Sequence, residues 1–253
     1  MNSTNRFHQL KQTKAPILTC YLPFSDPLIF KGIEEVYADC GVDVIELGLP
    51  AETPYADGPT TANSMKRAFK NNKDLVGLKE QVQLIRDNCP RTGTVVMGYE
   101  ESMDISHILM ESGPNIDGIL CLSREVNLQK ISWSYDGYPI YRILFLSHDL
   151  TDDELEVAIN SQGYIMLAAT SGKTGVRSTI SDNSRQIAKI KAAGIETPVL
   201  LGIGISNPDH AAQAIAMGAD GVIIGSACVE HALEGKAALT SFLTSIRRAL
   251  NDA

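Results

Sequence analysis

The chain has 253 residues, of which 44% are hydrophobic and 21% are charged, and its formal net charge is −8. This composition is typical of a globular protein with a sizeable core and argues against intrinsic disorder. The net negative charge argues against nucleic acids and anionic membranes as partners, because the electrostatic field of the whole protein would repel them. A local pocket for one phosphate group is compatible with this charge.

Short apolar runs alternate along the chain with longer segments of helical period, which is the signature of consecutive βαβ units. Eight runs are expected to form strands: Pro16–Tyr21, Val42–Leu47, Thr94–Gly98, Gly118–Leu122, Pro139–Leu146, Tyr164–Ala168, Pro198–Gly202 and Gly221–Ile224. Eight amphipathic stretches are expected to be helical: Pro27–Cys40, Thr60–Asn88, Asp104–Ser112, Asn127–Ser134, Asp152–Ser161, Asp182–Ala193, Pro208–Met217 and Ala238–Leu250.

Eight strands, eight helices and this chain length predict a (β/α)8 barrel, the TIM-barrel fold. We expect one domain over residues 1–253, because no linker or shift in composition divides the chain. A doubly wound open sheet is the structural alternative, but it usually has fewer strands at this length. In a barrel the active site lies at the C-terminal ends of the strands, so the residues there are the candidates for function.

Glu46 stands at the C-terminal end of the second predicted strand, among apolar neighbours. A carboxylate in a barrel mouth is unfavourable unless it is paired or protonated, and such surroundings raise its pKa towards neutrality, where acid–base catalysis is efficient. Asp57 follows shortly before a predicted helix, and two carboxylates in different surroundings can divide acid and base roles. The alternatives are a buried ion pair for Glu46 and a helix cap, with Gly58 and Pro59, for Asp57.

Glycines end the last two predicted strands, in "LGIGIS" at residues 201–206 and "IIGSA" at residues 223–227. Glycine lets the backbone approach a ligand closely, and amides at a helix N-terminus attract a phosphate dianion. The loops after strands 7 and 8 are the recurrent phosphate site of this barrel. We therefore predict phosphate binding at Gly202, Gly204 and Gly225; the alternative is that these glycines only form tight strand-to-helix turns.

A third glycine-rich segment, Ala169–Thr179, follows the sixth predicted strand. It is not a P-loop, because Leu167 stands where that motif requires its first glycine. The segment is long for a connection of this kind, and long loops often form lids or binding loops. We expect it to close over the phosphate with the Thr174 hydroxyl and the Gly175 amide near the ligand; the alternative is an ordinary flexible surface loop.

The five scattered cysteines include no C-x-x-C pair, which argues against a disulfide framework or a zinc site and favours a reducing, cytoplasmic compartment. The histidines lack metal-ligand spacing, so no metal is expected. No lysine ends a predicted strand, which disfavours a Schiff-base aldolase. The polar N-terminus does not resemble a signal peptide, and no apolar run approaches the roughly 18–20 residues that span a bilayer.

Several segments resemble, in the same order, the motifs of the tryptophan synthase α subunit family. The sequence "ELGLPAETPYADGPT" at residues 46–60 is similar to the family's ELG-P-FSDP-ADGP signature, and "SGKTGVR" at residues 171–177 is similar to its GVTG-R loop. The sequences "GIGIS" and "GSA" are similar to its two phosphate-binding turns, and "CYLPFSDP" at residues 20–27 to its Y-TAGDP segment. The chain is thereby identified as a divergent member of that family.

The resemblance implies a lyase of tryptophan biosynthesis that cleaves indole-3-glycerol phosphate to indole and glyceraldehyde 3-phosphate by retro-aldol chemistry. It implies that Glu46 is the acid/base, which protonates the indole C3 and helps deprotonate the leaving hydroxyl. Asp57 would hold the indole N–H and stabilise the indolenine intermediate, and Thr174 would contact Asp57 on loop closure. The phosphate-binding amides that the resemblance implies are those of Gly175, Gly204, Gly225 and Ser226.

The family also implies no cofactor in this chain, since pyridoxal phosphate would be held by a β-subunit partner in an α2β2 assembly. The chain departs from the family's motifs at residues 51–54 and 122–124, and at Met166, where the family has a tyrosine inside the strand. Two alternatives therefore stand beside the lyase. One is a paralogue that acts on another phosphorylated small molecule, and the other is a non-catalytic partner that activates a β subunit.

Overall fold

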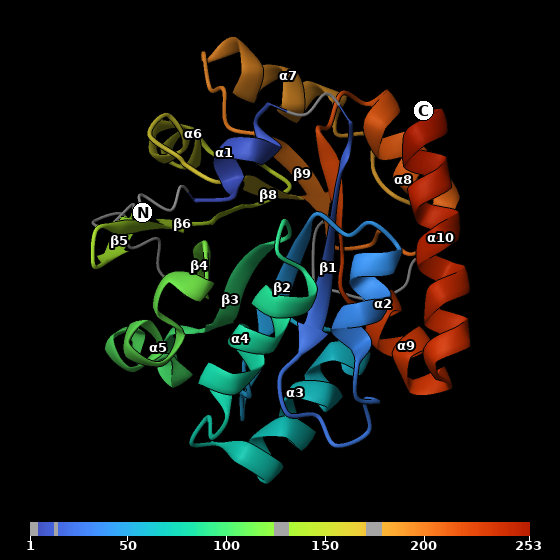
Figure 1. Cartoon of the computed structure of the whole chain (residues 1–253). Helices are drawn as coiled ribbons and strands as arrows, with labels where there is room; N and C mark the ends of the chain where they lie inside the picture. Colours follow the sequence, from blue (N-terminus) through green and yellow to red (C-terminus); the bar gives the residue numbers. More distant parts are fainter. Residues whose placement is uncertain (1–4, 13–14, 124–131, 171–178) are drawn as a thin grey trace.

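A computed structural model describes residues 5–12, 15–123, 132–170 and 179–253 of the chain (Figure 1). Its strands form one sheet, in the order β5-β6-β4-β3-β2-β1-β10-β9-β8-β7. Their bounds are β1 Ile17–Pro23, β2 Val44–Gly48, β3 Gly93–Tyr99, β4 Gly118–Leu122, β5 Ser132–Tyr135, β6 Tyr138–Arg142, β7 Leu144–Leu146, β8 Ile165–Ala168, β9 Val199–Gly202 and β10 Gly221–Ile224.

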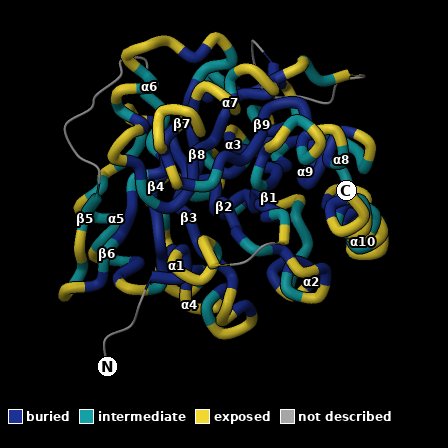
Figure 2. Tube along the Cα trace, turned by 90° about the horizontal axis from the view of Figure 1, so that it is seen from above, coloured by how far each residue is buried: buried dark blue, intermediate teal, exposed yellow. Residues whose placement is uncertain are grey.

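Helices follow most of the strands and surround the sheet, as the view in Figure 2 shows, with the buried strands at the centre and the exposed residues on the outer helices. The α-helices are α1 Phe7–Leu10, α2 Ile33–Asp39, α3 Pro59–Asn72, α4 Leu78–Asn88, α5 Ile105–Ser112, α6 Asp152–Ala158, α7 Ser184–Ala192, α8 Pro208–Ala216, α9 Ser226–Glu234 and α10 Lys236–Asp252. Two short 3-10 helices are η1 Glu100–Ser102 and η2 Gly113–Asn115. In the described part of the chain, no helix is both long enough and apolar enough to cross a membrane.

The sheet closes into a barrel through strands β6 and β7. β1 pairs in parallel with both β2 and β10, and parallel pairing continues to β6 on one side and to β7 on the other. Only Ile143 separates β6 from β7, and its amide donates a hydrogen bond of 2.9 Å to the carbonyl oxygen of Ile119. Because the chain itself joins the two ends of the ladder, the predicted (β/α)8 barrel is confirmed.

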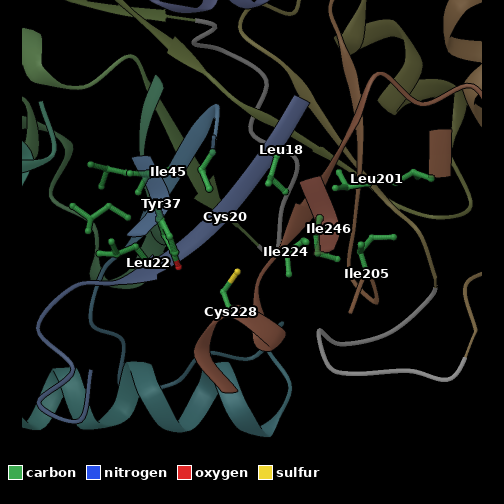
Figure 3. Close-up of a cluster of buried hydrophobic side chains, with 14 of the residues drawn as sticks. Leu18, Cys20, Leu22, Tyr37, Ile45, Leu201, Ile205, Ile224, Cys228 and Ile246 are labelled. Carbon is green, nitrogen blue, oxygen red and sulfur yellow. The ribbon is translucent and has the colours of Figure 1, made fainter. Parts of the chain in front are cut away.

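Alternation along the strands sorts side chains into two buried layers. Leu18, Cys20 and Leu22 of β1 point outward and belong to the cluster between strands and helices, where they lie near Tyr37 and Cys228 in Figure 3. The intervening residues of β1 face the barrel interior, where a second cluster lies. Since successive side chains of a strand point to opposite faces, this sorting decides which polar residues reach the interior.

The segment between β4 and β6 differs from the prediction. A helix was expected over Asn127–Ser134, but Ser132–Tyr135 is the strand β5, which pairs antiparallel with β6, and residues 127–131 lie outside the described residues. The reason is the turn at Asp136 and Gly137, whose φ angles are +47° and +80°. An Asp-Gly pair with two positive φ angles is a strong β-hairpin signal, and it prevails over weak helical periodicity.

Other expected elements differ in extent. The expected helix Thr60–Asn88 is two helices, α3 and α4, because the chain turns at Leu75 and Gly77, which have φ angles of +57° and +83°. The expected strand Pro139–Leu146 is divided into β6 and β7. Helices α1 and α9 were not predicted; α9 begins directly at the glycine-rich exit of β10, where the sequence pattern indicates only a turn.

Candidate active site

A pocket of about 680 Å3 opens where the strands pass into the helices at the C-terminal end of the barrel. The walls are mainly apolar side chains from β3, β4, β7, β8 and β10. Five residues that the sequence predicts as functional line this one pocket, although they are far apart in the chain: Glu46, Asp57, Gly204, Gly225 and Ser226.

Glu46 points into the barrel from β2. Its neighbours Ile45 and Leu47 belong to the outer cluster, so the alternation of the strand directs the carboxyl group inward, where it is 3% exposed. The hydroxyl of Tyr164, directly before β8, donates a hydrogen bond to Glu46 Oε1. Within the described residues the partner of this carboxyl group is thus a phenol, not the cation of a buried ion pair.

The surroundings of Glu46 change its acidity. Burial raises the pKa of Glu46 to about 7, and the negative charge of Asp57 acts in the same direction, while the hydrogen bond from Tyr164 opposes them. Burial and the Glu46 carboxylate in turn raise the pKa of the Tyr164 phenol well above its usual value, so the phenol keeps its proton. A carboxyl group with a pKa near 7 is populated in both protonation states and can both give and accept a proton.

Asp57 lies in the loop from β2 to α3, and its side chain is 5% exposed. The hydroxyl of Tyr99, the last residue of β3, donates a hydrogen bond to Asp57 Oδ2. The ring of Tyr55 packs edge-on against Tyr99, with ring centroids 4.8 Å apart. The N-cap residue of α3 is Gly58, so Asp57 does not occupy the capping position, and its carboxylate is fixed beside the pocket instead.

The chain turns sharply after β9, at the edge of the pocket. Ile203 and Gly204 have φ angles of +60° and +109°, and both residues line the pocket. Glycine adopts positive φ readily, whereas a β-branched residue does so only under strain, and such strain is concentrated at functional sites. The Nδ1 atom of His210 lies 3.0 Å from the carbonyl oxygen of Gly204, which ties the turn to α8.

Two helix N-termini meet at the same side of the pocket. Helix α9 begins at Ser226 with Gly225 as its N-cap, and Thr61 lies in the first turn of α3. The Oγ atoms of Thr61 and Ser226 are 3.0 Å apart, and both side chains are buried. The first amides of a helix have no partner within it and carry partial positive charge, so this corner of the pocket favours an anion such as a phosphate group.

Thr174 and Gly175, the two predicted residues of the Ala169–Thr179 loop, lie outside the described residues, so their closure over the pocket stays a prediction. No group of three or more His, Cys, Asp or Glu side chains is placed to hold a metal ion in the part of the chain that the structure describes. Met166, which stands where the resemblance expects a tyrosine, lies on β8 and lines the pocket.

Sequence reasoning did not identify four polar side chains of the site: Tyr21, Thr61, Tyr99 and Tyr164. The three tyrosines lie on the inward-facing positions of their strands or next to them. Strand alternation counted from Glu46 would single out Tyr21, which is the register partner of Glu46 on β1. Thr61 has no comparable signal, because a threonine in the first turn of a helix is common and its contact with Ser226 joins distant parts of the chain.

Comparison with protein families gives one match over nearly the whole chain: residues 7–249 match the model of the family described as "Tryptophan synthase alpha chain". Curated relatives carry the same name. The protein from Geobacter sulfurreducens is 30% identical, with 97% of each chain covered. The protein from Pelobacter propionicus is 28% identical, with 98% of this chain and 97% of the relative covered.

Solved structures show the same fold. A structure of Mycobacterium tuberculosis tryptophan synthase matches with a TM-score of 0.79 at 22% identity, covering 98% of this chain and 99% of that chain. The structure of tryptophan synthase subunit alpha from Legionella pneumophila matches with a TM-score of 0.73 at 21% identity, covering 99% of this chain and all of that chain. At these identities the likeness establishes the barrel, and the assignment to a family depends on the sequence matches.

Proposed function

The chain belongs to the tryptophan synthase alpha chain family, and we propose that Glu46 and Asp57 carry out its lyase reaction in the pocket at the barrel mouth. The reaction is the retro-aldol cleavage of indole-3-glycerol phosphate to indole and glyceraldehyde 3-phosphate, a step of tryptophan biosynthesis. The observation that supports the proposal most strongly is the burial of Glu46 in an apolar pocket, where its pKa is raised to about 7.

Glu46 would act first as an acid and then as a base. The protonated carboxyl group gives its proton to C3 of the indole ring, which converts the ring to an indolenine with positive charge at nitrogen. The carboxylate that remains accepts the proton of the hydroxyl on the chain carbon bonded to C3. The carbon–carbon bond then breaks, its electron pair returns to the ring, and the hydroxyl oxygen becomes the aldehyde oxygen, so Glu46 ends protonated as it began.

Asp57 would hold the indole nitrogen. Its carboxylate accepts a hydrogen bond from the ring N–H, and its negative charge stabilises the positive charge that develops on the ring after protonation at C3. The hydrogen bond from Tyr99 fixes the carboxylate in place, so little reorganisation is needed during the reaction. The negative charge of Asp57 also raises the pKa of Glu46, which links the two carboxyl groups in one site.

The phosphate would bind against Gly204, Gly225 and Ser226, where α9 begins and its first amides have no partner within the helix. Thr174 and Gly175 would close over it from the loop after β8. The apolar walls would accommodate the indole ring and exclude water from the reacting carbons. The pocket thus combines two carboxyl groups with an anion-binding corner, and the substrate carries an indole ring and a phosphate group.

We further propose that the chain acts in the cytoplasm with a β subunit in an α2β2 assembly. The sequence match to the tryptophan synthase alpha chain family supports this partnership. Pyridoxal phosphate would belong to that β subunit, and the cleavage described above requires only side chains of this chain.

The test is indole release from indole-3-glycerol phosphate by the purified chain, alone and with a cognate β subunit. We expect release by the wild type and loss of at least a hundredfold in Glu46→Gln, since general acid–base catalysis contributes about 10²–10⁴-fold. No release under either condition would contradict the lyase. Activation of the β subunit in the same mixture would then support a non-catalytic partner, and turnover of another phosphorylated compound would support a paralogue.

A further inference from the structure

The hydroxyl of Tyr21 is a buried polar group at the active site that has no hydrogen-bond partner within the described part of the chain. Tyr21 lies on β1 as the register partner of Glu46 on β2, and neighbouring residues in register place their side chains on the same face of a sheet. The side chain lines the pocket and is only 2% exposed. Among the described residues its hydroxyl has no hydrogen-bond partner, which is unfavourable in the free protein and points to a ligand.

The ring of Tyr21 is held in place. A Cβ atom at Gly48 would lie 2.1 Å from the ring and its hydroxyl, so the ring packs directly on the Gly48 backbone. The hydroxyl of Tyr37 donates a hydrogen bond of 2.7 Å to the Tyr21 carbonyl oxygen and anchors the backbone from the helix side. The Tyr21 hydroxyl is therefore presented to the pocket from a preorganised position.

The nearby carboxylates keep this hydroxyl protonated, so that it can donate a hydrogen bond. Burial and the negative charges of Asp57, Asp26 and Glu46 raise the pKa of Tyr21 well above its usual value, so the phenol retains its proton. Each of these carboxyl groups is already engaged elsewhere. Asp26 accepts hydrogen bonds from Ser64 and Arg67, while Glu46 and Asp57 accept theirs from the phenols described above.

The substrate offers few hydrogen-bond acceptors to the Tyr21 hydroxyl. In indole-3-glycerol phosphate the ring N–H would be held by Asp57, as proposed above, and the phosphate dianion is repelled by the carboxylates near Tyr21. The remaining acceptors are the two hydroxyl oxygens of the glycerol chain. We propose that the Tyr21 hydroxyl donates a hydrogen bond to a hydroxyl oxygen of that chain beside Glu46, and so selects substrates with a hydroxylated chain. The proposal rests on the proposed function for the identity of the substrate.

Tyr21→Phe tests the proposal, with Tyr138→Phe as a matched control. The Tyr138 hydroxyl is also buried, but it donates a hydrogen bond of 2.6 Å to Asp117, and Tyr138 does not line the pocket. We expect Tyr21→Phe to keep or raise the thermal unfolding temperature, because it removes an unpaired buried hydroxyl. We expect Tyr138→Phe to lower that temperature and to leave kcat/KM within twofold of the wild type.

The ligand experiment uses indole-3-glycerol phosphate and indole-3-propanol phosphate, which keeps the ring and the phosphate but lacks both chain hydroxyls. Tyr21→Phe should lower kcat/KM for the glycerol compound about tenfold, as expected for one lost hydrogen bond of substantial strength. The inhibition constant of the propanol compound should stay within twofold. An unchanged kcat/KM would overturn the proposal, and so would an equal loss for both compounds, which would indicate packing of the ring.

Binding without turnover separates this proposal from the proposed function. Calorimetric titrations of both compounds compare Glu46→Gln with Glu46→Gln/Tyr21→Phe. A wild type that binds indole-3-glycerol phosphate but releases no indole would contradict the lyase alone. The Tyr21 proposal would still require that the second substitution lowers the affinity for the glycerol compound about tenfold and the affinity for the propanol compound less than twofold. Equal affinities of both proteins for the glycerol compound would overturn it, and a wild type that binds neither compound would overturn both proposals.

Discussion

The Tyr164 hydroxyl donates a hydrogen bond to the Glu46 carboxyl group inside the barrel, and it is the interaction that opposes the effect of burial on this residue. A donor to a carboxylate stabilises its charged form and lowers its pKa. Burial and the charge of Asp57 on one side, and this one phenol on the other, therefore decide at which pH Glu46 titrates.

Replacing Tyr164 with phenylalanine should move the pH dependence of the reaction. The wild type is expected to show an inflection in kcat/KM near pH 7, because the pKa of Glu46 is about 7. Tyr164→Phe removes the interaction that lowers this pKa, so the inflection should shift to higher pH. Profiles of kcat/KM from about pH 5.5 to 9, a range centred near neutrality, would show this shift. An unmoved inflection, or one displaced to lower pH, would contradict the assignment.

The raised pKa of Glu46 also predicts how the stability of the folded chain depends on pH. The pKa of Glu46 is about 7 in the folded chain and about 4.3 in an unfolded one. A raised pKa in the folded state means that the stability contributed by this group is present at low pH and is lost as pH rises through 7. The Glu46→Gln variant does not lose this stability, because glutamine does not ionise. Its stability relative to the wild type should therefore rise by about 2–3 kcal/mol between roughly pH 5 and 8.

Urea unfolding at the two pH values measures this difference. The exposed residue Glu52 provides a control, because Glu52→Gln removes the same charge from the surface. Its stability difference from the wild type should change little with pH. A constant difference for Glu46→Gln would show that this residue titrates normally in the folded chain and would remove the main support for its acid–base role.

Two glycine substitutions should separate folding from phosphate binding. At Gly225 an added Cβ meets nothing within 4 Å, so Gly225→Ala should fold with an unfolding temperature close to that of the wild type. The methyl group would nevertheless occupy space at the anion-binding corner, and we expect KM to rise about tenfold or more, as for a lost charge-assisted hydrogen bond. At Gly48 the Cβ meets the Tyr21 ring at 2.1 Å, so Gly48→Ala should lower the unfolding temperature. A large loss of stability in Gly225→Ala, or an unchanged KM, would be evidence against the phosphate site.

The pair Thr61 and Thr60 offers a finer test of the same corner. Thr61→Val removes the hydroxyl that is 3.0 Å from Ser226 Oγ and should raise KM several-fold, consistent with a net hydrogen-bond contribution of about 1 kcal/mol. Thr60 donates a hydrogen bond of 2.8 Å to Glu230 and does not line the pocket. Thr60→Val should therefore leave KM unchanged. Equal KM values in the two variants would mean that Thr61 does not position Ser226.

The barrel and the inward direction of Glu46 could be predicted because both depend on local periodicity. Runs of apolar residues identify the strands, and alternation between Ile45 and Leu47 places Glu46 on the interior face. The hairpin of β5 and β6 did not follow from periodicity, because its signal is the two-residue turn at Asp136 and Gly137 and not a pattern of apolar residues.

The contacts that complete the site could not be predicted in the same way. Tyr164 and Glu46 are 118 positions apart, and Thr61 and Ser226 are 165 apart. Periodicity within one element indicates which face a side chain lies on, but the partner depends on the packing of the whole barrel. That the Tyr21 hydroxyl has no hydrogen-bond partner among the described residues likewise depends on side chains from several distant parts of the chain.

Indole release from indole-3-glycerol phosphate, measured side by side for the wild type, Glu46→Gln and Glu52→Gln, is the most direct test of the proposed chemistry. We expect release by the wild type and by Glu52→Gln at similar rates, and a loss of at least about a hundredfold in Glu46→Gln, which should still bind the substrate. Activity retained in Glu46→Gln, or a wild type that releases no indole alone or with a β subunit, would contradict the assignment of Glu46 as the acid and base of this lyase.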